Sequence, residues 1–399
     1  MLVKLKDVVT FHRGLTYKKL DEVAISSNIV LRANNIDLDT FSLNFNELRY
    51  ISDTISIPNS KILQKDSILI CVASGSRSHL GKVAYIDQDY GCAFGGFMGM
   101  FLPKNEDVYM RYIFKIFISS HFRKLVDGLT DGTNINNLKF SLIENFEFNL
   151  PTVEEQRRIV AKLDAAFEKI TKATKLTQEN VNNSRKFFEY ELEKLLRKQD
   201  DDWKMKTLKD VSIDFGRGKS KHRPRNDKIL YGGRYPFIQT GDVRGSEHVI
   251  IKYKQTYNDL GLAQSKLWPK GTICITIAAN IAETGVLNFD ACFPDSVIGI
   301  TVNPNETIND YVEYLLQAFK TKLQSMGKGS AQDNINLSTF ENQTFPFPGI
   351  EKQRAIVDRL NKLLHQAVAL ESTYRRKLTE FNMMKQSMLN EAFLESAVE

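Results

Sequence analysis

The sequence predicts an α+β fold: two similar mixed α/β domains, separated by two long helices that form an antiparallel coiled coil with pseudo-two-fold symmetry. Three observations lead to this prediction. The chain of 399 residues is longer than one hydrophobic core usually holds. A short proline-marked segment occurs twice, and each copy precedes a long stretch without proline or glycine. Short apolar runs bounded by turn residues fill the remainder, as expected for strand-rich domains.

The composition is that of a soluble globular protein, with 42% hydrophobic and 26% charged residues. No apolar run reaches the roughly 18 residues that span a bilayer, and the N-terminus lacks the apolar core of a signal peptide. We therefore expect a cytoplasmic location. The net charge of +6 is a mild indication of an anionic partner. The cysteines form no C-x-x-C pair, which favours buried thiols over a zinc site; they are Cys71, Cys92, Cys274 and Cys292.

Matching segments occur in the same order in the two halves of the chain. Repeats of this kind are sought before any fold is assigned, and two copies with a common order predict pseudo-two-fold symmetry. The matches are 5–8 with 208–211, Arg13-Gly14 with Arg217-Gly218, 66–72 with 271–277, 109–114 with 311–316, and 134–136 with 334–336.

The first domain, 1–150, alternates short apolar runs with turn signals. Residues 67–72 are a predicted buried strand that leads into the polar loop 73–79. Residues 109–125 are predicted to form one amphipathic helix.

Each long helix is predicted to begin at a proline-marked hinge. The first hinge, 150–160, reads LPTVEEQRRIV, and the second, 347–357, reads FPGIEKQRAIV. The residue before a proline prefers extended backbone, so the helix begins after it. Glu154, Glu155 and Glu351 then fall in the first helical turn, where the helix dipole favours negative charge.

The helical stretches 151–199 and 348–399 each carry a narrow apolar seam with spacings of three and four residues, which is typical of a coiled coil. We expect the two seams to pair; the alternative is that each helix packs into its own domain. The first seam contains Ile159, Leu163, Ala166, Ile170, Ala173, Thr177, Val181, Ser184, Phe188 and Leu195. The second contains Ile356, Leu360, Leu363, Ala367, Leu370, Tyr374, Leu378, Phe381, Met384 and Met388.

The second domain, 200–347, repeats the plan of the first. Its most basic segment is a loop at 217–225, where glycine and proline exclude regular structure and five residues are lysine or arginine. Residues 235–243 are predicted to be a strand that runs into a polar loop.

The sequence contains no recognisable catalytic or metal-binding motif. Gly218-Lys219-Ser220 resembles the end of a phosphate-binding loop, but that motif needs a glycine where Ile213 stands. The histidines lack metal-ligand spacing, no nucleophile elbow is present, and the tetrapeptide of amino-methyltransferases is absent. We expect no catalytic residues, no bound metal and no cofactor in this chain.

Duplicated variable domains, each followed by a P-x-x-E-x-Q-R-x-I-V hinge and a long helix, resemble the specificity subunit of Type I restriction-modification enzymes. The resemblance covers the whole chain and includes the glycine-containing segments before Asn134 and Asn334. One departure is that these hinges keep one or two prolines where a richer run is common.

The resemblance implies that 1–150 and 200–347 are target recognition domains and that 151–199 and 348–399 are spacer helices. Each domain would read one half of a split site in double-stranded DNA, and the helix pair would set the gap. The implied partners are two modification (methyltransferase) subunits and restriction or translocase subunits, with no membrane. S-adenosylmethionine, ATP and Mg would belong to those partners.

Polar residues on loops that leave strands are the candidate DNA contacts, because Lys and Arg neutralise phosphates while Arg, Asn and Gln match base edges. In the first domain they are Arg13, Arg32, Asn34, Asn35, Ser74, Ser76, Arg77 and His79. In the second they are Arg217, Lys219, Lys221, Arg223, Arg225, Gln239, Arg244 and Asn280. The alternative for any one of them is an ordinary solvated side chain. For the whole protein, the alternatives are a two-domain scaffold that does not bind DNA and a self-sufficient nuclease.

Overall fold

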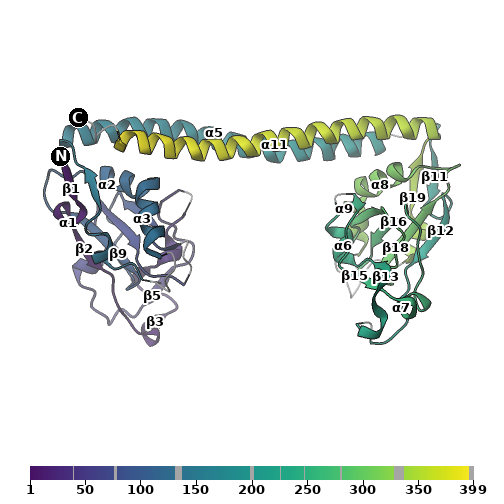
Figure 1. The fold of residues 1–399 in the computed structure, drawn as a ribbon, viewed down its shortest axis with the longest axis horizontal. Coiled ribbons are helices and arrows are strands. Elements are labelled where there is room, and N and C mark those ends of the chain that lie inside the picture. The colour runs from purple at the N-terminus through teal and green to yellow at the C-terminus, as the bar shows by residue number, and fades with distance from the viewer. Residues whose placement is uncertain are drawn as a thin grey trace. The chain divides into compact units, whose positions relative to one another are not determined.

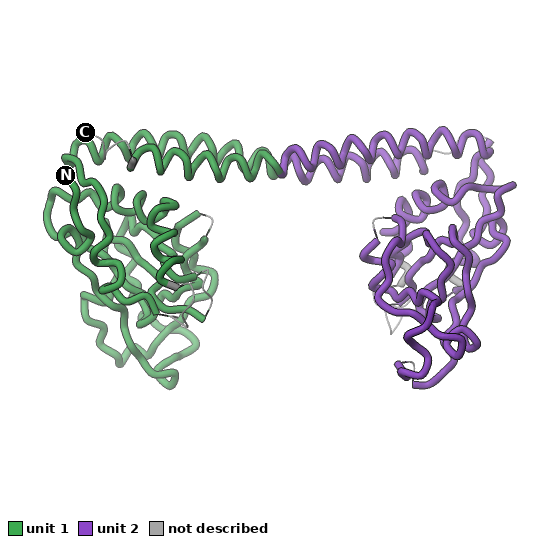
Figure 2. Tube along the Cα trace, in the orientation of Figure 1, with its two compact units in different colours: residues 1–178, 376–399 green, residues 179–375 purple. Residues whose placement is uncertain are grey.

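The computed structural model describes residues 1–38, 40–75, 79–130, 137–197, 202–224, 226–246, 248–278, 281–327 and 337–394. The chain forms two compact units (Figure 2): unit 1 is 1–178 with 376–399, and unit 2 is 179–375. Each unit holds one α/β domain and one end of each long helix. These helices are α5 (Val153–Arg197) and α11 (Ile350–Leu394), and each has 45 residues.

The α/β domain of unit 1 is built around a four-stranded sheet in the order β2-β9-β6-β7. Its central strand β6 is buried along its whole length, and helices α2 and α3 share a hydrophobic core with it (Figure 1). A second four-stranded sheet has the order β3-β5-β4-β8, and β1 pairs with β10 in a two-stranded sheet. The elements are β1 (Leu2–Lys4), α1 (Leu5–Val8), β2 (Val9–Arg13), η1 (Lys19–Asp21), β3 (Glu22–Val23), β4 (Asn28–Leu31), η2 (Ala33–Asn35), β5 (Arg49–Ile51), η3 (Asn59–Lys61), β6 (Ser67–Cys71), β7 (Val83–Ile86), β8 (Ala93–Phe94), β9 (Met98–Pro103), α2 (Met110–Phe117), α3 (Ser120–Thr130), α4 (Phe140–Ile143) and β10 (Glu147–Asn149).

Unit 2 repeats this architecture with the sheet β12-β18-β16-β17-β14 and the smaller sheets β13-β15 and β11-β19. Its elements are β11 (Lys204–Thr207), β12 (Ser212–Arg217), η5 (Lys228–Leu230), β13 (Tyr231–Phe237), α6 (Thr240–Arg244), β14 (Val249–Ile250), β15 (Gln255–Tyr257), α7 (Asp259–Ala263), β16 (Ile273–Thr276), β17 (Thr284–Leu287), β18 (Val297–Val302), α8 (Asn309–Ala318), α9 (Lys320–Gly327), α10 (Leu337–Asn342) and β19 (Thr344–Phe347).

Strand register confirms the predicted match between 66–72 and 271–277. In unit 1, Gly99 of β9 lies between Arg13 of β2 and Ile70 of β6. In unit 2, Ile298 of β18 lies in the same way between Arg217 and Ile275. The first residues of the two matched segments, Asp66 and Gly271, both have left-handed backbone, with φ of 59° and 88°. The turn before the central strand is therefore the same in both units.

A buried glutamine fixes each hinge. The Gln156 side chain donates to the Asp107 and Pro151 carbonyls, both at 2.8 Å, and its Oε1 accepts the Tyr109 N–H at 2.8 Å. In unit 2, Gln353 does the same with Glu306, Pro348 and the Ile308 N–H, at 3.2, 2.9 and 3.2 Å. Both glutamines are fully buried. The glutamine of the hinge motif thus ties the start of each long helix to the loop before α2 or α8.

The predicted alignment of 109–114 with 311–316 is wrong in its register. The Tyr112 hydroxyl donates to the Asn149 carbonyl at 2.9 Å, and the Tyr311 hydroxyl donates to the Pro346 carbonyl at 2.8 Å. Each acceptor lies two residues before the hinge proline, so Tyr112 and Tyr311 are the true equivalents. Each of the two matched segments contains two tyrosines, and the predicted alignment paired Tyr109 with Tyr311 in place of Tyr112 with Tyr311.

One turn later, the same helices are tied to the long helices by different chemistry. In unit 1 the Lys115 ammonium pairs with the Asp164 carboxylate of α5 at 2.6 Å. In unit 2 the Tyr314 hydroxyl donates to Asn361 Oδ1 of α11 at 2.7 Å. We call this contact the brace; it is ionic in unit 1 and neutral in unit 2.

Residues 109–125 do not form the single predicted helix. The helix ends at Phe117, and α3 begins at Ser120. Between them, the Ser119 hydroxyl donates back to the Ile116 carbonyl at 2.6 Å, and the Ser119 Oγ accepts the Phe122 N–H at 3.4 Å. A buried serine at this position favours a local turn over continued helix.

The long helices pair antiparallel in unit 2, as predicted. Arg185 of α5 contacts Glu371 of α11, whereas Glu191, further along α5, contacts Arg359, which is earlier in α11. In unit 1, Leu163 of α5 shares a core with Leu389 of α11. The helices also pack against the α/β domain of each unit, so pairing and domain packing occur together.

The predicted second seam is wrong at Leu370 and Met384, which are exposed. In the seam position beside Leu370 lies Glu371, whose carboxylate accepts two hydrogen bonds from Arg185, both at 2.8 Å, and one from Arg375. Hydrogen bonds from Arg185, and then from Arg375, lower the pKa of Glu371 to about 2. A paired carboxylate thus occupies a seam position that an apolar pattern assigns to leucine.

Candidate nucleic-acid interface

A groove of about 1000 Å³ lies in unit 1, where β2, β4, β6 and β9 meet their loops. It is lined by five of the predicted contact residues: Arg13, Arg32, Asn34, Ser74 and His79. Lys19, Arg49 and Phe97 line it as well, and no pattern in the sequence marked them as contacts. These residues come from distant parts of the chain, so the groove depends on the fold.

Arg13 is held at the edge of the groove. Its Nε donates to the Gly96 carbonyl at 3.1 Å, and its terminal NH2 donates to Asn137 Oδ1 at 3.4 Å. The next residue, Gly14, lies so close to the β8–β9 turn that a Cβ atom would stand 2.0 Å from the Gly95 carbonyl oxygen. Glycine at 14 therefore allows β2 to bring Arg13 against that turn.

Arg32 is half-buried in the groove, and its Nε has no hydrogen-bond partner among the described residues. The neighbouring Arg49 is paired with Glu22 at 3.4 Å. A buried N–H without an acceptor costs free energy until a ligand supplies one. The unpaired Nε makes Arg32 a candidate ligand contact in the groove.

His79 adds no positive charge to the groove at neutral pH. Burial lowers the pKa of its imidazole below the usual 6.5, and the nearby Lys82 ammonium lowers it further. A neutral imidazole has one donor and one acceptor nitrogen, so it suits a base edge better than a phosphate.

Asn35 is a correction to the predicted contacts. It is fully buried, its Nδ2 donates to the Asn44 and Glu47 carbonyls at 2.9 and 3.2 Å, and its Oδ1 accepts the Arg32 N–H at 2.8 Å. These bonds hold the backbone that carries Arg32 and Asn34. The role of Asn35 is therefore structural. Ser76 and Arg77 lie outside the described residues.

The basic loop of unit 2 follows β12, at the position equivalent to Arg13 and Gly14. A Cβ on Gly218 would lie 2.2 Å from the Phe293 carbonyl oxygen, so glycine is required here too. Gln264 Oε1 accepts the N–H groups of Lys221 and His222 at 2.6 and 3.0 Å. The loop backbone is thus fixed by its neighbours.

Three side chains of this loop, Arg217, Lys219 and Lys221, are exposed and have no ion pair among the described residues. Arg223 differs, because its guanidinium donates to the Ser220 and His222 carbonyls at 2.7 and 2.8 Å and so bonds to its own loop. Arg225 lies outside the described residues, as do Asn134, Asn280 and Asn334.

A smaller groove of about 230 Å³ adjoins the basic loop and brings Ser220 together with Gln239 and Ser296. The segment predicted as a polar loop here is helix α6, and Gln239 is its N-cap residue. The Gln239 Nε2 donates to Gln255 Oε1 at 2.6 Å. Arg244, at the end of α6, is exposed but does not line this groove.

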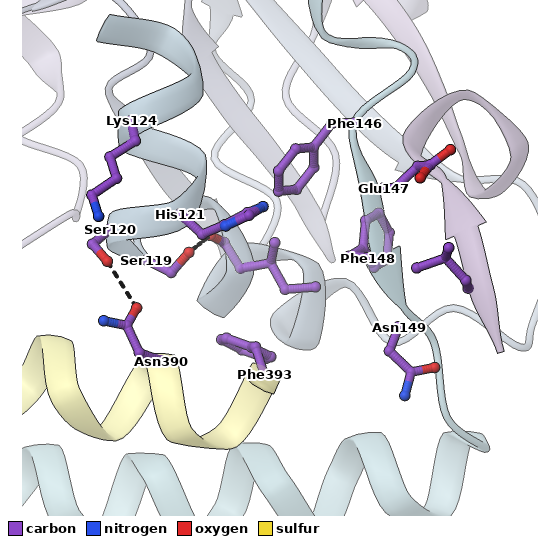
Figure 3. A pocket seen from close by; sticks show the side chains of 12 residues that line it. Ser119, Ser120, His121, Lys124, Phe146, Glu147, Phe148, Asn149, Asn390 and Phe393 are labelled. Carbon is purple, nitrogen blue, oxygen red and sulfur yellow. Dashed lines mark hydrogen bonds between the residues drawn. The ribbon is translucent and has the colours of Figure 1, made fainter. Parts of the chain in front are cut away.

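An apolar cavity of about 300 Å³ lies in unit 1 between α3, β10 and the last turns of α11, and Phe146, Phe148 and Phe393 line it (Figure 3). Ser119, Ser120 and His121 are consecutive here, but they form no catalytic pair. The Ser120 hydroxyl donates to Asn390 Oδ1 at 2.8 Å, which ties α3 to α11. The contacts of this cavity hold a helix against the domain.

The described residues contain no group of three or more His, Cys, Asp or Glu side chains arranged to hold a metal ion. Among them, no helix combines the length and apolarity that crossing a membrane requires. All four cysteines are buried and unpaired, as predicted.

The α/β domain occurs twice, and in each copy an arginine-glycine pair ends the first strand of the main sheet against the turn before β9 or β18. This repetition defines a protein with two related surfaces. The chain belongs to the Type I restriction modification DNA specificity domain family, whose model matches residues 1–181 and 200–380.

Relatives and solved structures agree with this family. The StySPI specificity subunit of Salmonella potsdam is 25% identical over 97% of this chain and 86% of its own length. The EcoKI specificity subunit of Escherichia coli K12 is 24% identical over 98% and 88%. A chain from a study of complex assembly in the type I R-M system shares the fold with a TM-score of 0.77, at 18% identity, over 98% of this chain and 97% of that one. The HsdS subunit from Thermoanaerobacter tengcongensis has a TM-score of 0.63 at 18% identity, over 98% and 96%.

Proposed function

We propose that this chain supplies the DNA sequence specificity of a Type I restriction-modification complex, with each domain reading one half of a bipartite site. The observation that carries the proposal is the equivalence of Arg13-Gly14 and Arg217-Gly218. In both units an arginine ends the first strand of the main sheet, and a glycine lets it approach the turn before the β9 or β18 strand. Two copies of one recognition device suit two half-sites.

The chemistry of the two surfaces suits DNA. Exposed Lys and Arg side chains neutralise phosphates and give affinity, whereas base-edge contacts give sequence selectivity. The exposed Arg217 has the bidentate fork that matches guanine, whereas the Arg13 guanidinium already donates to Gly96 and Asn137. Gln239 carries an amide of the kind that matches adenine, and its Nε2 donates to Gln255. Three positive charges on the loop after β12 form a local basic surface, although the chain as a whole carries a net charge of only +6.

The long helices are the proposed connection between the half-sites. A helix of 45 residues is about 68 Å long at 1.5 Å per residue. Both hinges are fixed by buried glutamines, so each domain starts its helix in the same defined way. We infer that the paired helices set the number of base pairs between the two half-sites.

Two modification subunits are the proposed partners of the helices. Phe187 of α5 and Met384 of α11 follow their hinge glutamines by the same number of residues, and they are 55% and 53% exposed. The equivalent placement of these apolar side chains on the two helices fits two copies of one partner. Methyl transfer, ATP hydrolysis and their cofactors S-adenosylmethionine, ATP and Mg belong to the modification and restriction subunits, and this chain acts without catalysis in the cytoplasm.

The test is co-expression of the chain with its cognate modification subunit, followed by sequencing of modified bases. We expect methylation of one bipartite motif. In the same complex, Lys219→Ala should lower the slope of log K against log salt by about one, as the loss of one phosphate contact would. Lys209→Ala is the matched control, because Lys209 is an exposed lysine in the turn before β12, whereas Lys219 follows that strand.

Two outcomes would contradict the proposal. A complex that protects no sequence, or one that binds DNA without any salt dependence, would favour the alternative of a two-domain scaffold that does not bind DNA. Magnesium-dependent cleavage by the purified chain alone would indicate a nuclease instead.

A further inference from the structure

A large aromatic side chain is exposed in the groove of unit 1. Phe97 lies in the turn between β8 and β9, and it is 70% exposed. Its neighbours Phe94 and Met98 are fully buried, so the core is complete without the Phe97 ring. The Phe97 ring therefore adds apolar surface to a groove that is also lined by Arg13, Arg32 and Arg49.

The backbone of this turn is fixed from several sides. The Phe97 carbonyl accepts the N–H groups of Val72 and Ala73 at 2.9 and 3.0 Å, and the Met98 N–H donates to the Gly95 carbonyl at 2.8 Å. The Arg13 Nε donates to the Gly96 carbonyl, on the residue just before Phe97. The backbone that carries Phe97 and the guanidinium of Arg13 are therefore both held at this turn, and both side chains line the groove.

We propose that Phe97 is a specificity-determining residue that contacts the 5-methyl group of a thymine in the first half-site. This inference rests on the proposed function and names what one position of that site reads. The thymine methyl is the apolar group that the major groove presents, and phenylalanine is one of the side chains that contact it. The adjacent Arg13 supplies the positive charge that brings the phosphate backbone to the groove.

The second domain provides a comparison at the same place. Its turn is closed by the Val297 N–H donating to the Pro294 carbonyl at 3.0 Å, and the Ser296 carbonyl accepts the Ile277 N–H at 3.0 Å. Ser296 therefore occupies the position of Phe97. The same turn thus carries an apolar ring in unit 1 and a hydroxyl in unit 2. This difference predicts that only the first half-site requires the thymine methyl group.

The experiment uses the complete chain with its cognate modification subunit and DNA that carries the methylated motif. Each thymine of the first half-site is replaced in turn by deoxyuridine, which removes only the methyl group. We expect one replacement to weaken binding about four-fold, as the loss of one buried methyl would. Phe97→Ser, which copies the second domain, should abolish this difference between thymine and uracil, and Phe97→Leu should retain it.

Ile25→Ala is the matched control, because Ile25 is an exposed apolar residue of the same unit outside the groove. The Ile25→Ala chain should bind the thymine DNA and the deoxyuridine DNA with the same affinities as the wild-type chain. A first half-site without thymine on either strand would overturn the proposal, as would a Phe97→Ser chain that keeps the preference for the methyl group. In either case methylation of the motif would persist, so the proposed function would stand.

Discussion

The brace between each α/β domain and its long helix makes a quantitative prediction. In unit 1 the Lys115 side chain is 7% exposed and pairs with Asp164, which is 34% exposed. Unit 2 makes the same connection with Tyr314 and Asn361 and uses no charge. Asp164→Asn removes the carboxylate and leaves a buried ammonium, whereas Lys115→Tyr with Asp164→Asn installs the pair found in unit 2.

The expected loss lies between two limits. Removing one partner of a fully buried ion pair costs about 3–5 kcal/mol, and removing an exposed partner costs at most about 1 kcal/mol. Since Asp164 is one-third exposed, Asp164→Asn should destabilise unit 1 by about 2 kcal/mol. This corresponds to a fall in Tm of about 4–8 °C for a unit of this size. The double variant should lie within about 1 kcal/mol of the unmodified chain, because its hydroxyl and amide can pair without charge.

Hydrogen exchange of unit 1 amides is the appropriate assay, and tryptophan fluorescence is its internal control. Both tryptophans, Trp203 and Trp268, lie in unit 2. The brace variants should therefore change amide protection in α2 and in the first turns of α5, while the fluorescence transition in urea stays the same. A change in both signals would show that the substitution acts on the whole chain.

The buried Lys115 ammonium should also make the stability of unit 1 depend on pH. Burial lowers the pKa of Lys115 below its usual 10.5. Between the lowered pKa and 10.5 the unfolded chain keeps the Lys115 proton that the native chain has lost, so the contribution of Lys115 to the stability of unit 1 should rise with pH in this window. The double variant lacks the ammonium and should lack this rise.

Two results would refute the reasoning. One is an Asp164→Asn chain as stable as the original, which would mean that solvent already screens the pair. The other is a double variant no more stable than the single one, which would mean that the unit 2 geometry does not transfer.

The basic loop, the hinge and the helix surface each provide a further test. Arg217→Ala should weaken specific binding and relax the preference at one base pair of the second half-site, by about 1–3 kcal/mol, measured by methylated-motif sequencing and titration. Gln156→Leu should lower the free energy of unfolding by about 2–4 kcal/mol, since it leaves buried carbonyls and the Tyr109 N–H unpaired; urea denaturation measures it. Phe187→Glu and Met384→Glu should each remove one modification subunit from the complex, as light scattering would show.

Much of the secondary structure could be predicted because it depends on local sequence patterns. The hinge motif, the two helical stretches and the buried central strands all follow from short-range rules on proline, apolar spacing and turns. The structure confirms the antiparallel pairing and the match of 66–72 with 271–277. The errors occur where one pattern allows more than one assignment. The tyrosines near the starts of α2 and α8 could be aligned in two registers, and the seam near Glu371 could be assigned to Leu370 or to Glu371.

The grooves could be predicted only in part, because they depend on contacts between distant segments. The rule that polar residues gather where strands end selected Arg13 and Arg32, which line the groove of unit 1, and Arg217, which ends β12; their contact with DNA stays a prediction. Composition could not show that Asn35 turns inward to bond Asn44, or that Arg223 bonds its own loop. Phe97 was missed because an isolated phenylalanine in a sequence indicates a core residue, and only its exposure in the structure contradicts that expectation.

The two units separate what is shared from what differs. Bonds between backbone and buried side chains recur in both, as the Gln156 and Gln353 hinges show. Side chains that face solvent or the grooves differ, as Phe97 and Ser296 do. Because backbone hydrogen bonds hold these turns, the exposed side chains on them can change without unfolding the domain. Substitutions of exposed residues usually alter the free energy of unfolding by less than about 0.5 kcal/mol. New DNA specificity can therefore arise at the turns without loss of the fold. A subunit that selects the DNA sequence for a larger complex requires this property.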